Sequence, residues 1–89
     1  MNSPKNADMM TGVAKGLMIA ALSRVRASNE GELPGGRTDV TINGIPFTVY
    51  GLSPVNAIVT VRCVIDGHGY ACDVGPKSGK LGKVRRFMP

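Results

Sequence analysis

Two cysteines and one histidine are the residues of this chain best suited to metal or redox chemistry. Cys63 and Cys72 lie in two apolar, β-branched stretches joined by turn residues at 66–69, a pattern that predicts a hairpin. With the turn centred on Gly67 and His68, Cys63 faces Cys72 at a position where antiparallel strands approach closely. This register also places one wholly apolar face on the hairpin and sets Arg62 opposite Asp73.

Three interpretations of the cysteine pair follow from that register. The thiols could be reduced and buried as small hydrophobic side chains, joined in a cross-strand disulfide, or used in redox chemistry. Reduced thiols are favoured, because two cysteines do not make a secreted disulfide scaffold and neither has a cationic neighbour on its own face. His68 lies several rungs away, at the hairpin tip, so no metal site and no cofactor is expected.

The segment 75–80, Gly-Pro-Lys-Ser-Gly-Lys, is a loop with some likeness to phosphate-binding loops. It fails the pattern of a nucleotide-binding P-loop, since the spacing is one residue short and Leu81 stands where Ser or Thr would hold magnesium. A weaker contact between this loop and a phosphate is retained as a hypothesis. No histidine–acid pair occurs at a suggestive spacing, so the chain is not expected to be an enzyme.

The strongest functional signal is the position of the charge. The net charge of +5 arises entirely after Pro76, because residues 1–76 carry six basic and six acidic residues. Such a segment attracts phosphate, and an aromatic ring within it can stack on a base. The predicted nucleic-acid or anion-binding residues are Lys77, Lys80, Lys83, Arg85, Arg86 and Phe87.

Two other interpretations of this basic segment remain open. It could contact an acidic protein surface, or it could be solvated charge on an edge strand that blocks edge-to-edge pairing. No recognised nucleic-acid-binding module supports the interpretation that this segment contacts nucleic acid. No helix–turn–helix is visible, and the strands show no pair of exposed aromatic residues of the kind that an RNA-recognition sheet uses.

Residues 4–28 are predicted to form one amphipathic helix, followed by a connector at 29–36 that contains three glycines and a proline. Gly12, Gly16 and Ala20 form a smooth ridge at four-residue spacing. The simpler explanation is close approach of the sheet or a loop. The alternative is a contact with another chain, which would make the protein a homo-oligomer through this helix.

Two hairpins are predicted at 37–50 and 57–74. In the first, Asn43-Gly44 is typical of a type I′ turn, which pairs Ile42 with Ile45 and Val40 with Phe47. Pro46 then directs its missing N–H away from the first strand, so the sheet should be unpaired there at that rung. Residues 80–89 favour a short edge strand or an extended tail.

The sequence therefore predicts a single α+β domain, with the helix packed on an antiparallel sheet of four to five strands. The predicted function is a small non-catalytic binding protein whose basic C-terminal segment contacts nucleic acid or a nucleoprotein complex. The alternative is a protein–protein interaction module, such as a phage-like accessory, inhibitor or virion component. No targeting peptide or membrane span is expected, which favours a cytoplasmic location, or a virion-associated one. The predicted core comprises Met10, Leu17, Ala21, Leu22, Val25, Val40, Ile42, Ile45, Phe47, Val49, Val59, Val61, Cys63, Ile65, Cys72 and Val74.

Overall fold

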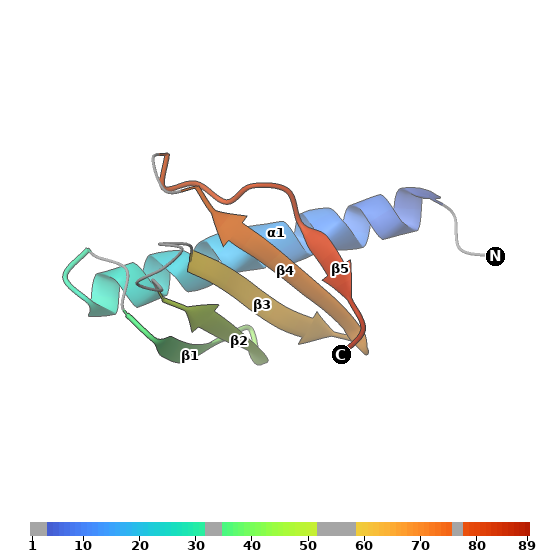
Figure 1. The fold of residues 1–89 in the computed structure, drawn as a ribbon. Coiled ribbons are helices and arrows are strands. Elements are labelled where there is room, and N and C mark those ends of the chain that lie inside the picture. Colours follow the sequence, from blue (N-terminus) through green and yellow to red (C-terminus); the bar gives the residue numbers. More distant parts are fainter. Residues whose placement is uncertain (1–3, 32–34, 52–58, 76–77) are drawn as a thin grey trace.

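One long helix lies across one face of a five-stranded antiparallel sheet (Figure 1), which confirms the predicted α+β fold. The computed structural model describes residues 4–31, 35–51, 59–75 and 78–89, with only the backbone of 4–8. The elements are α1 (Pro4–Ser28), β1 (Arg37–Ile42), β2 (Ile45–Tyr50), β3 (Val59–Ile65), β4 (His68–Val74) and β5 (Arg85–Phe87). The strands lie in the sheet in chain order, so each described strand pairs with its neighbours in sequence.

Helix α1 ends where the chain enters the left-handed region at Glu30 and Gly31, with φ of 57° and 85°. The amide of Gly31 donates to the carbonyl of Arg26 at 2.7 Å, which satisfies one of the carbonyls left free at a helix C-terminus. Serine is favoured at the N-cap of a helix, which predicts that Ser3 caps α1, but Ser3 lies outside the described residues. The buried face of α1 contains Ala14, Met18, Ala21, Leu22 and Val25.

The ridge of small residues on α1 does not meet the sheet. Gly12, Gly16 and Ala20 are all exposed, and a Cβ added at either glycine would find no atom within 4 Å. The expected close approach of a sheet or loop is therefore wrong, because the ridge lies on the side of the helix that faces away from the core. Contact with another chain stays a prediction.

The hairpin of β1 and β2 has the predicted register, with Ile42 opposite Ile45 and Val40 opposite Phe47. Asn43 and Gly44 have φ of 52° and 79°, as a type I′ turn requires. The β2–β3 ladder begins at Phe47 and does not include Pro46, as expected for a residue with no N–H to donate.

The predicted register of the second hairpin is wrong. Ile65 pairs with His68 rather than Tyr70, so Cys63 faces Tyr70 and Cys72 faces Val61. The turn is Asp66-Gly67, with φ of 50° and 79°, which repeats the geometry of the first hairpin. Asp-Gly is a preferred residue pair for a type I′ turn, whereas Gly-His is not, and this favours reversal of the chain at Asp66-Gly67.

The predicted face of the sheet is still correct for each side chain of this hairpin. Moving the turn by one residue shifts the pairing by two positions, which leaves each residue on the same face. The apolar face of β3 and β4 packs under α1. All predicted core residues are buried except Met10, Leu17, Val40 and Ile45, which are partly buried against the core. The structure adds Ala14, Met18, Tyr70, Ala71 and Leu81 to the buried set.

The basic segment is built into the domain rather than attached to it. Leu81 is buried and forms an isolated bridge with Val74, and β5 pairs with β4 through Gly69–Phe87, Tyr70–Arg86 and Ala71–Arg85. The predicted edge strand is therefore confirmed. The described residues 78–89 therefore do not form a cationic segment separate from the domain, because Leu81 is buried and Val84 packs against the core.

Candidate nucleic-acid interface

No described element covers the face of the sheet opposite α1, and this uncovered face contains a cluster of one arginine and two aromatic rings. Arg62 projects from the centre of the sheet on β3. Its guanidinium carbon lies 4.3 Å from the centroid of the Phe87 ring and 5.8 Å from that of Tyr50. These distances fall within the range of cation–π attraction. In the described part of the chain no carboxylate pairs with Arg62, so its positive charge is not neutralised locally.

Small residues on β4 allow Phe87 to reach across the sheet. Phe87 on β5 pairs with Gly69 on β4, which in turn pairs with Val64 on β3. A Cβ on Gly69 would lie 2.6 Å from two carbons of the Phe87 ring, so the ring occupies the space that a side chain at Gly69 would fill. Ala71, the next residue on this face, is also small. Phe87 therefore lies over β4 and contacts the guanidinium of Arg62.

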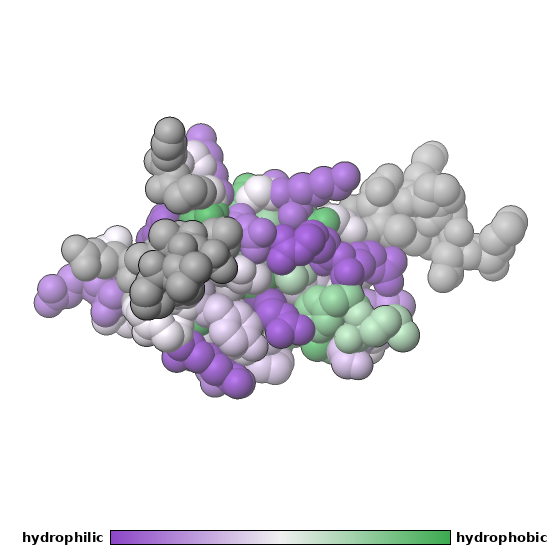
Figure 2. All heavy atoms as spheres, in the orientation of Figure 1, coloured by the Kyte–Doolittle hydropathy of each residue, from purple (hydrophilic) through white to green (hydrophobic). Residues whose placement is uncertain are grey.

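A shallow hollow of about 350 Å³ surrounds this cluster, which we call the aromatic–arginine cluster (Tyr50, Arg62 and Phe87). Its walls include Pro46, Thr48 and Val64. The view in Figure 2 looks onto this face of the sheet and shows mostly polar surface, with a hydrophobic patch beside the C-terminal end of the chain. Val64 and Met88 are 42% and 94% exposed, so apolar surface is available to a planar ligand.

Among the aromatic residues of the described strands, Tyr50 is exposed and Phe87 is half-buried, so the structure does not contradict the expectation that the strands lack a pair of exposed aromatic residues. Tyr50 shares the uncovered face with Thr48 by simple alternation along β2, and this parity could have been read from the sequence. Phe87 was identified only as part of the basic segment. Its proximity to Arg62 depends on β5 pairing with β4, which no local pattern predicts.

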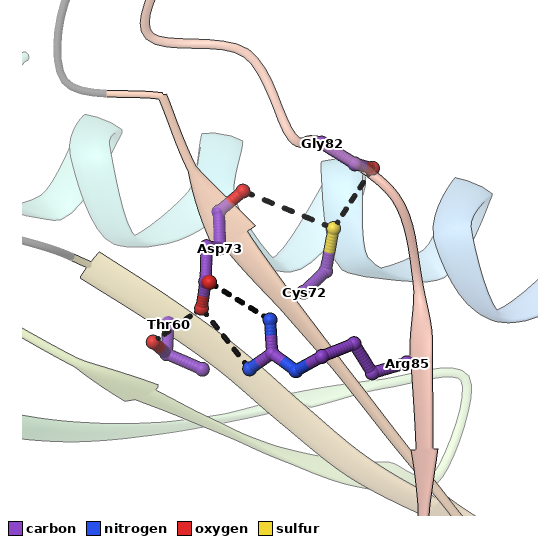
Figure 3. Close-up of polar contacts among 5 residues, drawn as sticks. All are labelled: Thr60, Cys72, Asp73, Gly82 and Arg85. Atoms are coloured by element: carbon purple, nitrogen blue, oxygen red, sulfur yellow. Dashed lines mark hydrogen bonds and ion pairs between the residues drawn. The ribbon is translucent and has the colours of Figure 1, made fainter.

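Asp73 holds the start of β5 against the sheet (Figure 3). Its carboxylate accepts hydrogen bonds from Arg85 at 2.8 and 3.1 Å and from the Thr60 hydroxyl at 2.8 Å. The predicted pairing of Asp73 with Arg62 is thus wrong, since Thr60 is its cross-strand neighbour. The hydrogen bonds from Arg85 hold the pKa of the Asp73 carboxyl below its usual value, more than partial burial raises it.

The structure separates the predicted binding residues into three groups. Arg85 and Phe87 lie on the uncovered face, and Arg85 is paired with Asp73. Arg86 lies on the other face, where it donates to Nδ1 of His68 at 2.8 Å and lies 5.8 Å from the Tyr70 ring centroid. Lys80 and Lys83 are exposed on the segment that leads into β5. Lys77 lies outside the described residues.

Cys63 and Cys72 are both free and buried, on the face of the sheet that packs against α1. They lie at diagonal rather than opposite positions, so the geometry on which the disulfide interpretation rested is absent. Burial raises the pKa of the Cys63 thiol to about 11 and also raises that of Cys72. The Cys72 thiol donates to the Gly82 carbonyl at 3.1 Å (Figure 3), which ties the segment before β5 to β4.

Three backbone amides of the loop at 75–80 are already used in hydrogen bonds within the loop. The amide of Gly75 donates to the carbonyl of Lys80, and the amide of Gly79 donates to the carbonyl of Gly75. The amide of Lys80 donates to the hydroxyl of Ser78. The amide of Gly82 donates to Asp73. A phosphate cradle needs several free amides that point at the ligand, whereas these four amides already donate to other acceptors. These four amides therefore do not form a phosphate cradle.

Within the described ranges, no group of three His, Cys, Asp or Glu side chains is placed to hold a metal ion. No described helix is long and apolar enough to cross a membrane. No family model, curated protein or solved structure matches this chain. Function must therefore be argued from the geometry of the uncovered sheet face.

Proposed function

We propose that this protein binds nucleic acid through the uncovered face of its sheet, with the basic C-terminal residues contacting phosphates. The observation that carries the proposal is the aromatic–arginine cluster. A sheet surface with two rings and a guanidinium offers stacking surfaces that suit every base, because each base has a π-face. Arg62 has no local carboxylate partner in the described chain, so its charge is available to a ligand.

The surrounding charges support this assignment. Both described carboxylates on this face are neutralised, Asp39 by Arg37 at 3.2 Å and Asp73 by Arg85 at 2.8 Å. These two aspartate side chains therefore do not add unpaired negative charge to this face. Lys83 lies on the segment before β5, and Arg86 lies on the opposite face of β5, so both add positive charge along this edge of the sheet rather than beside the rings. Phosphates neutralised by these side chains would release counterions, which predicts binding that weakens as salt rises.

Single-stranded nucleic acid is the expected form, because stacking on the cluster requires exposed bases. Fluorescence anisotropy with a labelled twelve-nucleotide single strand and the matching duplex, at two salt concentrations, tests the proposal. Phe87→Leu and Tyr50→Leu are each expected to weaken single-strand binding, since stacking contributes roughly 1–3 kcal/mol per base. Arg62→Gln should also weaken it, whereas Arg24→Gln, on the helix side, should change it less than twofold.

Circular dichroism spectra of each variant would confirm that the fold is retained. Polyglutamate serves as a control polyanion without bases. Equal affinity for polyglutamate and for the oligonucleotide would refute base stacking and would favour an acidic protein surface as the partner. Binding that falls with salt but ignores all three cluster substitutions would place the contact elsewhere.

A further inference from the structure

A second hollow lies on the helix side of the sheet, between α1 and the segment 79–81. Its volume is about 390 Å³, within the range of roughly 300–1,000 Å³ that is typical of small-molecule sites. Leu22 and Leu81 form its apolar floor and are 5% and 9% exposed. Ile19 is at its rim and is 51% exposed, which leaves a large hydrophobic side chain uncovered beside the opening.

Three cationic side chains line the same hollow. Lys15 and Arg26 come from α1, and Lys80 comes from the segment before β5. Spacing of three to four residues places the helix members on one stripe, which also includes Ser23. Arg26 is held in place by donating to the Gly79 carbonyl at 3.1 Å.

No carboxylate lines this hollow, and none of the three cations forms an ion pair with a described residue. Like charges around one opening repel each other, and a bound anion relieves that repulsion. The apolar floor and the exposed Ile19 favour an anion with an apolar part over an inorganic anion, because an inorganic anion would leave these apolar side chains uncovered. The pocket thus combines a cationic rim with a hydrophobic floor.

We propose that this pocket binds a small organic anion, with a phosphate or carboxylate head between Lys15, Arg26 and Lys80 and a short apolar body over Leu22 and Leu81. The site lies on the face of the sheet opposite the aromatic–arginine cluster. Apart from Lys80, which is also one of the basic C-terminal residues, it is therefore separate from the proposed nucleic-acid interface. Nothing in this inference requires that interface to bind bases.

Titration of the full chain with hexyl phosphate, followed by NMR amide shifts, tests the site. Inorganic phosphate and hexanol supply the head and the body alone. We expect hexyl phosphate to shift amides of residues 15–26 and 79–81 and to bind at least tenfold more tightly than either fragment. The combined variant Lys15→Gln and Lys80→Gln should weaken it by at least tenfold, whereas Lys83→Gln should change it less than twofold.

Each contrary result identifies a different error. Equal shifts with hexanol would show a generic apolar crevice and would overturn the role of the cations. Retained affinity in the combined lysine variant would do the same. If a single-stranded oligonucleotide shifts these amides at lower concentration than hexyl phosphate does, the phosphate belongs to nucleic acid and the small-ligand proposal is wrong. Arg62→Gln should leave hexyl phosphate binding unchanged, which separates this test from that of the uncovered face.

Discussion

Replacing Gly69 with alanine should detach β5 from the sheet. The new Cβ would lie 2.6 Å from two ring carbons of Phe87 and 2.6 Å from its carbonyl oxygen. The ring could rotate away, but the carbonyl belongs to the backbone of β5. Since Gly69 and Phe87 are directly paired, the strand itself must move. The clash therefore acts on the element that supplies Phe87 to the aromatic–arginine cluster.

The size of the effect follows from what β5 contributes. Forcing an extra methyl group into a packed site costs about 1–3 kcal/mol. Strand β5 has only three residues and its pairs with β4 are few, so it should yield before the rest of the sheet does. For a domain of this size, each kcal/mol lowers the melting temperature by about 4–8 °C.

Urea unfolding followed by circular dichroism measures this loss. Gly82→Ala is the matched control, because its added Cβ would lie 3.6 Å from the nearest atom, the Asp73 carbonyl oxygen, an ordinary contact. The penalty should shrink when Gly69→Ala is made in a Phe87→Ala background, since two of the three close contacts disappear. A Gly69→Ala protein as stable as Gly82→Ala would refute the packing argument. Oligonucleotide affinity should fall in parallel with the loss of β5.

Three further predictions concern charge, thiols and the helix. Because the folded pKa of Asp73 is lowered, its pair with Arg85 stabilises the fold above the unfolded pKa of an aspartate and is lost as pH falls through the folded value. Asp73→Asn should remove that part of the acid sensitivity. It should lower the unfolding free energy at pH 7 by about 0.2–1 kcal/mol, because the pair is half exposed. A variant whose stability depends on pH as that of the original protein does would contradict this prediction. Cys63 and Cys72 are buried and have raised pKa values, so iodoacetamide at pH 7 should label them only after unfolding in urea, as mass spectrometry would show. Gly16→Ala should raise the unfolding free energy by about 1 kcal/mol, since the added methyl group meets no atom within 4 Å; a loss of stability, or a change in sedimentation, would instead indicate that the ridge packs against another chain.

The parts of the fold that local rules govern could be predicted from sequence. Asn43-Gly44 determines the turn, and with it the register of the first hairpin and the side on which Val40 and Phe47 lie. Alternation along β3 identified the buried face. The predicted register of the second hairpin was wrong because a turn centred on Gly67-His68 places the oppositely charged Arg62 and Asp73 across from each other. The backbone preference of Asp66-Gly67 for the turn outweighs this attractive pairing.

The candidate site was harder to predict because it depends on distant segments. Tyr50 could have been assigned to the uncovered face by counting residues along its strand. The contact between Arg62 and Phe87 could not, since it requires β5 to pair with β4 and requires Gly69 to be small under the ring. The apolar floor of the cationic pocket likewise joins Leu22 to Leu81, which are far apart in the sequence.

The sheet of this protein is a simple meander, and its topology has a kinetic consequence. Every described strand pairs with the strand before or after it in the chain, so the loops that must close are short and the mean sequence separation of strand contacts is low. Low contact order is associated with fast folding, because little chain entropy is lost before contacts form. The two tight turns at Asn43-Gly44 and Asp66-Gly67 can each nucleate a hairpin independently. The β4–β5 connection is longer and β5 is short, so Phe87 should reach Arg62 only after the hairpins have joined.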